Sequence, residues 1–154
     1  MQRMRIFIFL FILGFGFEVN AQVLVVDGDS LEKGHERIRL NGIDAPEYNQ
    51  PCWDEKGVEY DCGAESTKFL KNLVKGKKIR CEYLKKDQYK RDLSECFAGD
   101  VNINKEMVAQ GWAVSYDIDG DGYPDEEKTA KEQKRGVWRG KFMRPELWRR
   151  LTKD

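Results

Sequence analysis

IRLNGIDAPE, residues 38–47, combines a strand pattern, an abrupt stop and three charged side chains. Its apolar residues predict a strand over Arg37–Ile43, and Pro46 ends it because proline cannot donate to a sheet ladder. Side chains alternate along a strand, so Arg39 points to the face opposite its apolar neighbours. Asp44 and Glu47 follow where the strand ends, a common place for functional groups held by a rigid scaffold.

A second acidic segment precedes this one. Val23–Val26 predicts a buried strand, and Asp27-Gly28-Asp29 predicts the turn after it. If Asp29, Asp44 and Glu47 came together, their carboxylates would repel unless a cation joined them. Oxygen ligands of this kind favour Ca²⁺ or Mg²⁺. Each segment taken alone is also compatible with a solvated loop, so the residues by themselves leave both interpretations open.

The composition indicates one folded domain. The chain has 154 residues, 40% of them hydrophobic, with 27 Lys and Arg against 27 Asp and Glu. These fractions exclude a membrane protein with many spans and argue against wholesale disorder. Since the formal net charge is zero, bulk charge does not indicate a polyanionic partner, and any phosphate binding must depend on local clusters.

Residues 1–21 predict a secretory signal peptide. Arg3 and Arg5 form a basic region, an apolar run covers Ile6–Phe17, and Val19-Asn20-Ala21 suits a signal peptidase. The apolar run is shorter than the roughly 20 residues that cross a bilayer, which disfavours the alternative of an uncleaved anchor. We therefore expect a secreted or periplasmic protein without membrane contact after cleavage.

Export would place the four cysteines in an oxidising compartment. An even count there predicts disulfides, and three pairings are open, with free thiols as the alternative in a chain that stays in the cytoplasm. Cys52 and Cys62 flank a polar loop, while Cys81 and Cys96 lie in two strand-like segments, 79–84 and 93–97. We predict the pairs 52–62 and 81–96. Zinc is disfavoured because the chain lacks a CxxC spacing and has a single histidine.

The rest of the chain predicts helices. Apolar residues on one face indicate a helix over Gly63–Lys75. Asn104 is the predicted N-cap of a short helix through Gln110, and Asp125 that of a third helix. Pro145 suits the first turn of a last helical segment. The basic residues of the tail are compatible with nucleic-acid contact, but we favour a solvated helix face with long side chains: Lys134, Arg135, Arg139, Lys141, Arg144, Arg149 and Arg150.

Asp117, Asp119 and Asp121 follow the start of a calcium loop, Asp-x-Asp-x-Asp-Gly. The twelfth position is Lys128, where such loops have glutamate. Two interpretations stay open, a second calcium site and a polar loop entering the third helix.

Several blocks of this chain together resemble one family. VVDGDS, IRLNGIDAPE, DQYKR, NKEMVAQGWA and GVW, in this order between Val23 and Trp138, are similar to the staphylococcal nuclease (thermonuclease) family. The resemblance implies an α+β protein, an OB-fold five-stranded β-barrel with three helices. It would occupy residues 22–142 and be followed by a C-terminal helical tail, 143–154.

The resemblance also assigns roles. It implies calcium held by Asp29, Asp44 and the carbonyl of Ala45, a catalytic trio of Arg39, Glu47 and Arg91, and a phosphate contact from Tyr89. The sequence departs from the family at Lys90, where the family usually has glycine, a residue that accepts a positive φ without strain.

The implied function is a secreted, Ca²⁺-dependent nuclease that cleaves DNA and RNA with low sequence specificity and leaves 3′-phosphate ends. We expect a monomer without a stable protein partner. Two alternatives remain. One is a non-catalytic OB-fold module that binds nucleic acid. The other is an adhesion or scaffold protein built around the acidic loop, residues 117–127.

Overall fold

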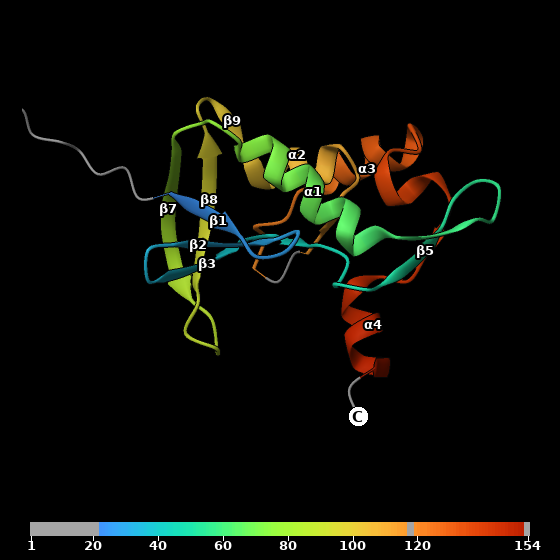
Figure 1. The fold of residues 1–154 in the computed structure, drawn as a ribbon, viewed down its shortest axis with the longest axis horizontal. Coiled ribbons are helices and arrows are strands. Elements are labelled where there is room, and N and C mark those ends of the chain that lie inside the picture. Colours follow the sequence, from blue (N-terminus) through green and yellow to red (C-terminus); the bar gives the residue numbers. More distant parts are fainter. Residues whose placement is uncertain (1–21, 117–118, 153–154) are drawn as a thin grey trace, which may run out of the picture.

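The computed structural model describes residues 22–116 and 119–152, so the predicted signal peptide lies outside the described residues. Its main sheet has the strand order β1-β2-β3-β8-β7 and curls into a half-barrel (Figure 1). Among the described strand pairs of this sheet, only β3–β8 is parallel. The sheet contains β1 (Val23–Val25), β2 (Ser30–Lys33), β3 (Glu36–Leu40), β7 (Ile79–Lys86), β8 (Asp92–Ala98) and the short β9 (Val101–Asn102), which pairs with β8. The five-strand path confirms the predicted sheet.

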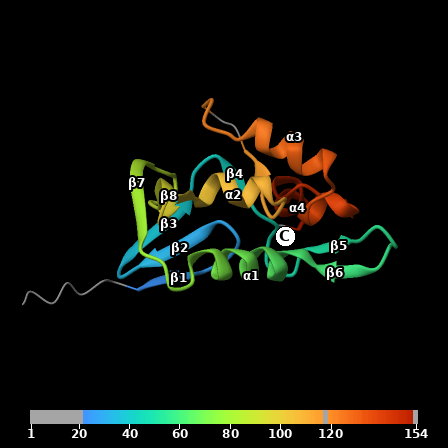
Figure 2. The same cartoon turned by 90° about the horizontal axis from the view of Figure 1, so that it is seen from above.

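Four α-helices accompany the sheet in the described ranges, and a 3-10 helix, η1 (Gly136–Arg139), precedes the last. They are α1 (Cys62–Val74), α2 (Ile103–Ala109), α3 (Pro124–Glu132) and α4 (Pro145–Thr152). Figure 2 shows α2 between α1 and α3. The fourth helix is the predicted tail helix, added to the three of the resemblance. None of these helices is long and apolar enough to cross a membrane.

The main core lies between the sheet and the first two helices. Leu31 and Leu40 reach it from the sheet, Leu70 from α1, and Met107 from α2. Each of these side chains is buried. The alternation of Ile38, Arg39 and Leu40 therefore works as expected, because the two apolar side chains enter the core and the arginine faces away from it.

Two small sheets extend the fold beyond the prediction. β4 (Ile43–Asp44) pairs with β10 (Val114–Ser115), and β5 (Pro51–Trp53) pairs with both β6 (Glu59–Asp61) and β11 (Lys141–Phe142). The predicted polar loop between two cysteines is thus a hairpin. Its turn forms because Asp54 accepts hydrogen bonds from two backbone N–H groups and Gly57 adopts a φ of 77°.

Both predicted disulfides are confirmed. Cys81 and Cys96 face each other directly across the β7–β8 pair. Cys52 of β5 is bonded to Cys62, the first residue of α1, so the hairpin is fixed to the start of the helix. Disulfides of this kind are typical of oxidising compartments.

The predicted cap of α2 is corrected. Asn102 is the N-cap and accepts a hydrogen bond from the N–H of Lys105. Asn104 is instead buried, where its side chain accepts from the N–H of Cys96 and donates to the carbonyl oxygens of Asn41 and Ser94. It therefore joins α2 to β8 and to the turn after β3.

The predicted cap of α3 is also corrected. Pro124 begins the helix, Tyr123 is its cap residue, and Asp125 lies in the first turn. Proline is favoured there because its fixed φ suits the first helical position and its missing N–H would have no helical partner.

Replacing Asn104 with alanine is expected to lower the free energy of unfolding by about 2–4 kcal/mol, because three buried backbone groups would each lose a hydrogen bond. Urea unfolding of the two proteins measures the difference. Asn72→Ala, at an exposed position of α1, is the matched control and should change the value by less than about 0.5 kcal/mol. A loss below about 1 kcal/mol for Asn104→Ala would contradict the bridging role.

Candidate active site

Asp29 and Arg39 are brought together by strand register. Asp29 immediately precedes β2, and the next residue, Ser30, pairs with Arg39 of β3. The Arg39 guanidinium donates from Nη1 to Oδ1 of Asp29. On the other side, Asp29 Oδ2 accepts from the N–H of Ala45 at 2.7 Å. A close approach at Gly28 allows this arrangement, since a Cβ there would lie 2.7 Å from the Ala45 Cβ.

Asp44 reaches the same guanidinium from the next strand. It lies in β4, pairs with Val114 of β10 and is 0% exposed. Arg39 Nη2 donates to Asp44 Oδ1 at 2.8 Å. Asp29 is likewise buried, with 2% exposed. One guanidinium therefore bridges two buried carboxylates. Burial lowers the pKa of Arg39, but the charges of Asp29 and Asp44 outweigh burial and raise it.

Burial makes the charge of Asp29 costly. It raises the pKa of this carboxyl from 3.8 to about 7, against the opposing effect of the Arg39 charge. A carboxylate that is buried to this degree gains from any additional positive charge placed beside it. The Asp29 side chain is therefore suited to bind a cation in addition to Arg39, whose charge alone does not offset the cost of burial.

The metal-free protein is expected to become less stable as pH rises from about 4 to about 7. In that window folded Asp29 still holds a proton that the unfolded chain has released, so the free energy of unfolding falls with pH. Urea unfolding across this range, with a chelator present, measures the effect. Asp29→Asn should flatten the dependence, whereas the exposed Asp100→Asn should leave it in place. Identical profiles for wild type and Asp29→Asn would contradict the prediction.

Glu47 is positioned by its backbone. Its N–H donates to Gln50 Oε1 at 3.0 Å, and its carbonyl accepts from the N–H of Gln50 at 2.9 Å. The start of α1 packs against the same peptide, where a Cβ on Gly63 would lie 2.0 Å from the Glu47 carbonyl oxygen. The Glu47 side chain is 36% exposed, so it is open to water while Asp44 is not.

Gln50 is a positioning residue that the sequence reasoning missed. It is buried, and its Nε2 donates to the carbonyl of Met143 at 2.7 Å. Gln50 thus connects the Glu47 turn to the segment that leads into α4. A glutamine in a polar loop gives no sequence signal for this role, because its two partners are backbone groups, one of them far along the chain.

Arg149 of α4 is a further site residue, and its assignment to a solvated helix face is wrong. Its Nη1 donates to Glu47 Oε1 at 2.6 Å and to Asp44 Oδ1 at 2.8 Å, and its Nη2 donates to Asp44 Oδ2 at 3.0 Å. Burial lowers the pKa of Arg149, but these hydrogen bonds and charges raise it. The guanidinium that contacts Glu47 therefore comes from the C-terminal tail.

The structure pairs the predicted catalytic Arg91 with Asp87. Arg91 Nε donates to Asp87 Oδ2 at 2.7 Å in the turn between β7 and β8. Tyr89, 60% exposed, lies beside it, with the guanidinium carbon 5.5 Å from the ring centroid. Lys90 has a φ of 62°, so it adopts the backbone conformation for which the family uses glycine. β8 begins directly after this turn, and its second residue, Leu93, pairs with Arg39 of β3. The turn therefore lies near Arg39 in the sheet.

The acidic loop after β10 has protein partners. Asp119 forms an ion pair with Lys85, and Asp121 Oδ2 accepts from Asn41 Nδ2 at 2.6 Å. Asp117 lies outside the described residues. The two described carboxylates therefore connect the loop to β7 and to the turn after β3.

The donors of the site fit a hard cation, although they form an incomplete ligand set. Asp29 and Asp44 supply oxygen atoms from buried carboxylates, the ligand type that Ca²⁺ and Mg²⁺ prefer. Within residues 22–116 and 119–152, no group of three or more His, Cys, Asp or Glu side chains is arranged to hold a metal. A cation held there would need further ligands, which backbone carbonyls, water or a substrate can supply.

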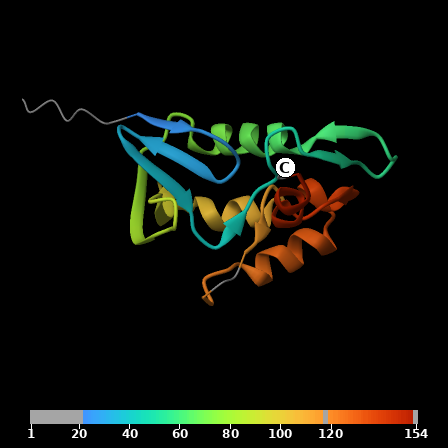
Figure 3. The ribbon, with the colours of Figure 1, turned by 90° about the horizontal axis from the view of Figure 1, so that it is seen from below.

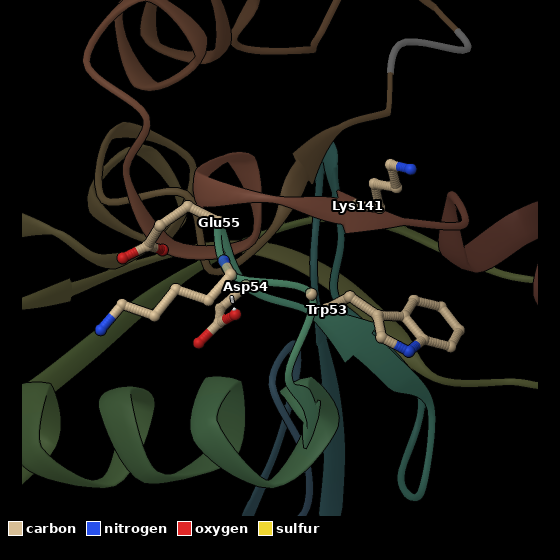
Figure 4. A pocket seen from close by; sticks show the side chains of 6 residues that line it. Trp53, Asp54, Glu55 and Lys141 are labelled. Carbon is tan, nitrogen blue, oxygen red and sulfur yellow. Dashed lines mark hydrogen bonds between the residues drawn. The ribbon is translucent and has the colours of Figure 1, made fainter.

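A separate hollow lies on the β5–β6 hairpin. Its volume is about 540 Å³, and it is lined by Trp53, Asp54, Glu55, Lys56, Gly57 and Lys141. In Figure 4 the Trp53 ring points to the side opposite the carboxylates of Asp54 and Glu55. The carboxylates and arginines of the site described above are not among its lining residues, so this hollow is separate from the site.

The fold and this centre of buried carboxylates and arginines define a small α+β protein with a site suited to an anionic ester. Residues 37–140 match the family described as "Staphylococcal nuclease homologue". The "Succinoglycan biosynthesis protein ExoI" of Rhizobium meliloti (strain 1021) is 39% identical over 124 residues, covering 79% of this chain and 65% of that protein.

Two further relatives carry nuclease names. An "Uncharacterized endonuclease" of Escherichia coli O157:H7 is 36% identical over 135 residues, covering 82% of each chain. The "Probable staphylococcal-like nuclease CAN3" of Oryza sativa subsp. japonica is 28% identical over 137 residues, covering 86% of this chain and 33% of that protein. The chain belongs to the staphylococcal nuclease family, a class of nuclease enzymes, and its curled sheet is the OB-fold of that family.

Proposed function

We propose that this protein is an exported, calcium-dependent nuclease that hydrolyses phosphodiester bonds of DNA and RNA with low sequence specificity and leaves 3′-phosphate ends. The observation that supports it most directly is the linkage of three carboxylates through two guanidinium groups. Arg39 joins Asp29 to Asp44, and Arg149 joins Asp44 to Glu47. A plain core does not need such a cluster, whereas hydrolysis of an anionic ester needs both charge neutralisation and a proton acceptor.

Each side chain has a role that its surroundings allow. Asp29, Asp44 and the Ala45 carbonyl would hold the ion, which when bound supplies a Lewis acid for a non-bridging phosphate oxygen. Glu47, the acid most open to solvent, accepts a proton from the attacking water or orients it. Arg39, held between the two proposed ion ligands, supplies the positive charge that stabilises the negative charge developing during attack.

The β7–β8 turn supplies the remaining substrate contacts in this proposal. Arg91 would provide a second guanidinium for the phosphate, and the exposed ring of Tyr89 would contact a neighbouring phosphate or base. Contacts to the phosphate backbone carry little sequence information, so low specificity is the expected consequence.

Digestion of plasmid DNA, single-stranded DNA and RNA by the purified protein tests the proposal. We expect cleavage with CaCl₂, none with a chelator, and products that a polymerase extends only after phosphatase treatment. Asp44→Asn should abolish cleavage, and Asp100→Asn, at an exposed position, should not. Equal digestion with chelator would refute calcium dependence. Retention of nucleic acid without cleavage in calcium would favour the non-catalytic OB-fold module.

Export has its own test. We propose that residues 1–21 are removed, and the two disulfides are consistent with an oxidising destination. N-terminal sequencing of protein recovered from the periplasm or the medium should begin at Gln22. Protein that begins at Met1, or that is found only in the cytoplasm, would contradict this assignment.

A further inference from the structure

Arg149 occupies the coordination positions of the proposed ion ligand Asp44. Its two terminal nitrogens reach both carboxylate oxygens, at 2.8 and 3.0 Å, and Arg39 donates to Oδ1 as well. Asp44 is fully buried, so these donors enclose the carboxylate. A calcium ion must lie about 2.3–2.6 Å from a ligand oxygen, where it would face the positive charge of Arg149 at short range.

The same guanidinium also contacts Glu47. Arg149 Nη1 donates to Glu47 Oε1 at 2.6 Å, a charge-assisted hydrogen bond that occupies one of the two oxygens that could accept a proton from water. Arg149 therefore restrains two proposed functions at once, ion binding at Asp44 and proton acceptance at Glu47.

The helix that carries Arg149 is loosely attached elsewhere. Pro145, at its beginning, is the only buried residue of α4, and the apolar side chains of Leu147 and Leu151 are exposed. Figure 1 shows α4 extending away from the rest of the fold, with its beginning near β5, and Figure 3 shows the same helix from below. Apart from Pro145 and the half-buried Trp148, α4 buries little apolar surface, so the ion pairs of Arg149 are a large part of what holds the helix to the site.

We propose that α4 is an autoinhibitory strap whose Arg149 competes with a divalent cation for Asp44. The inference rests on the proposed function, because it takes Asp29 and Asp44 as the ion ligands. In the metal-free protein Arg149 neutralises Asp44 and occupies Oε1 of Glu47. Cation binding at Asp44 displaces Arg149, loosens α4 and frees the Glu47 carboxylate. Linkage makes the effect reciprocal, so removing the guanidinium must tighten cation binding.

Calcium affinity, measured by isothermal titration calorimetry with CaCl₂, tests the competition without any cleavage readout. Arg149→Met keeps most of the apolar stem of the side chain and removes its charge. We expect its dissociation constant for calcium to fall about tenfold, as when a competing charge-assisted hydrogen bond is lost. The matched control is Arg150→Met, the exposed neighbour on the same helix, which should keep the wild-type affinity.

Hydrogen exchange of residues 145–152 provides the second readout. In wild type, calcium should accelerate exchange in this segment, and in Arg149→Met exchange should be fast with or without calcium. An unchanged or weaker calcium affinity in Arg149→Met, or α4 exchange that calcium does not alter, would overturn the strap. A variant with unchanged affinity that cleaves more slowly at saturating calcium would instead make Arg149 a substrate contact. If neither protein binds calcium, the proposed cation site itself is refuted.

Discussion

Replacing Arg39 with glutamine is expected to reduce the rate of nucleic-acid cleavage by at least about a hundredfold. The guanidinium is the group that faces both proposed ion ligands, and losing a donor to the developing charge costs about 10²–10³ in rate. The substitution should also destabilise the metal-free protein by about 3–5 kcal/mol, because two buried carboxylates lose their shared partner. Digestion rates in calcium and urea unfolding in chelator measure the two effects.

Two further variants separate charge from geometry at this position. Arg39→Lys keeps a positive charge but cannot bridge two carboxylates as a fork, so it should recover part of the stability and little of the rate. Arg37→Gln changes an exposed arginine on the same strand and should leave both measurements near wild type. A folded Arg39→Gln protein with a rate within threefold of wild type, set against the roughly hundredfold loss expected for a lost donor, would refute the assignment.

Glu47→Gln is expected to lower the cleavage rate by about 10²–10⁴, the usual range for a lost proton acceptor. The amide is nearly the same size as the acid and can still accept from Arg149, so the fold should be retained. Calcium affinity should remain near wild type, because the proposed ligands are Asp29, Asp44 and the Ala45 carbonyl. Single-turnover digestion at saturating calcium, together with calorimetry, separates the lost chemistry from lost ion binding.

The control for this variant is Glu55→Gln, at an exposed position in the β5–β6 turn. It removes the same charge from the surface and should not change the rate. Cleavage by Glu47→Gln at the wild-type rate would exclude Glu47 as the residue that accepts a proton from the attacking water or orients that water. A loss of rate accompanied by a matching loss of calcium affinity would make it an ion ligand.

Local patterns predicted most of the secondary structure. Periodicity and spacing over short distances predicted the helix after Cys62, the two strands of the β7–β8 hairpin and the two disulfide pairs. The prediction of Asn104 as a helix cap was wrong, because the sequence looks the same whether an asparagine caps a helix or forms buried hydrogen bonds between elements. Only packing distinguishes them: Asn102 lies at the helix start, and Asn104 faces the core.

Part of the site could also be anticipated. IRLNGIDAPE carries Arg39, Asp44 and Glu47 within ten residues, but the single strand predicted over residues 37–43 is wrong: β3 ends at Leu40, and after a turn at Gly42 the chain forms β4 over Ile43–Asp44. The resemblance assigned Asp29 to the site, but its position beside Arg39 depends on register, since Ser30 opposes Arg39 only once β2 and β3 are paired. The hairpin that contains Cys52 and the bridge made by Gln50 had no comparable signal.

The sequence alone identified Asp29, Arg39, Asp44 and Glu47 as candidate site residues. They lie close together in the chain, and the strands β2 and β3 that bring Asp29 to Arg39 are consecutive. Only the tertiary structure decided which arginine faces Glu47. Arg149 is 102 positions away, and a basic residue on a short exposed helix has the same pattern whether it is solvated or docked. The choice between these states depends on the electrostatic attraction of buried carboxylates, which exists only after the strands have brought Asp44 and Glu47 together.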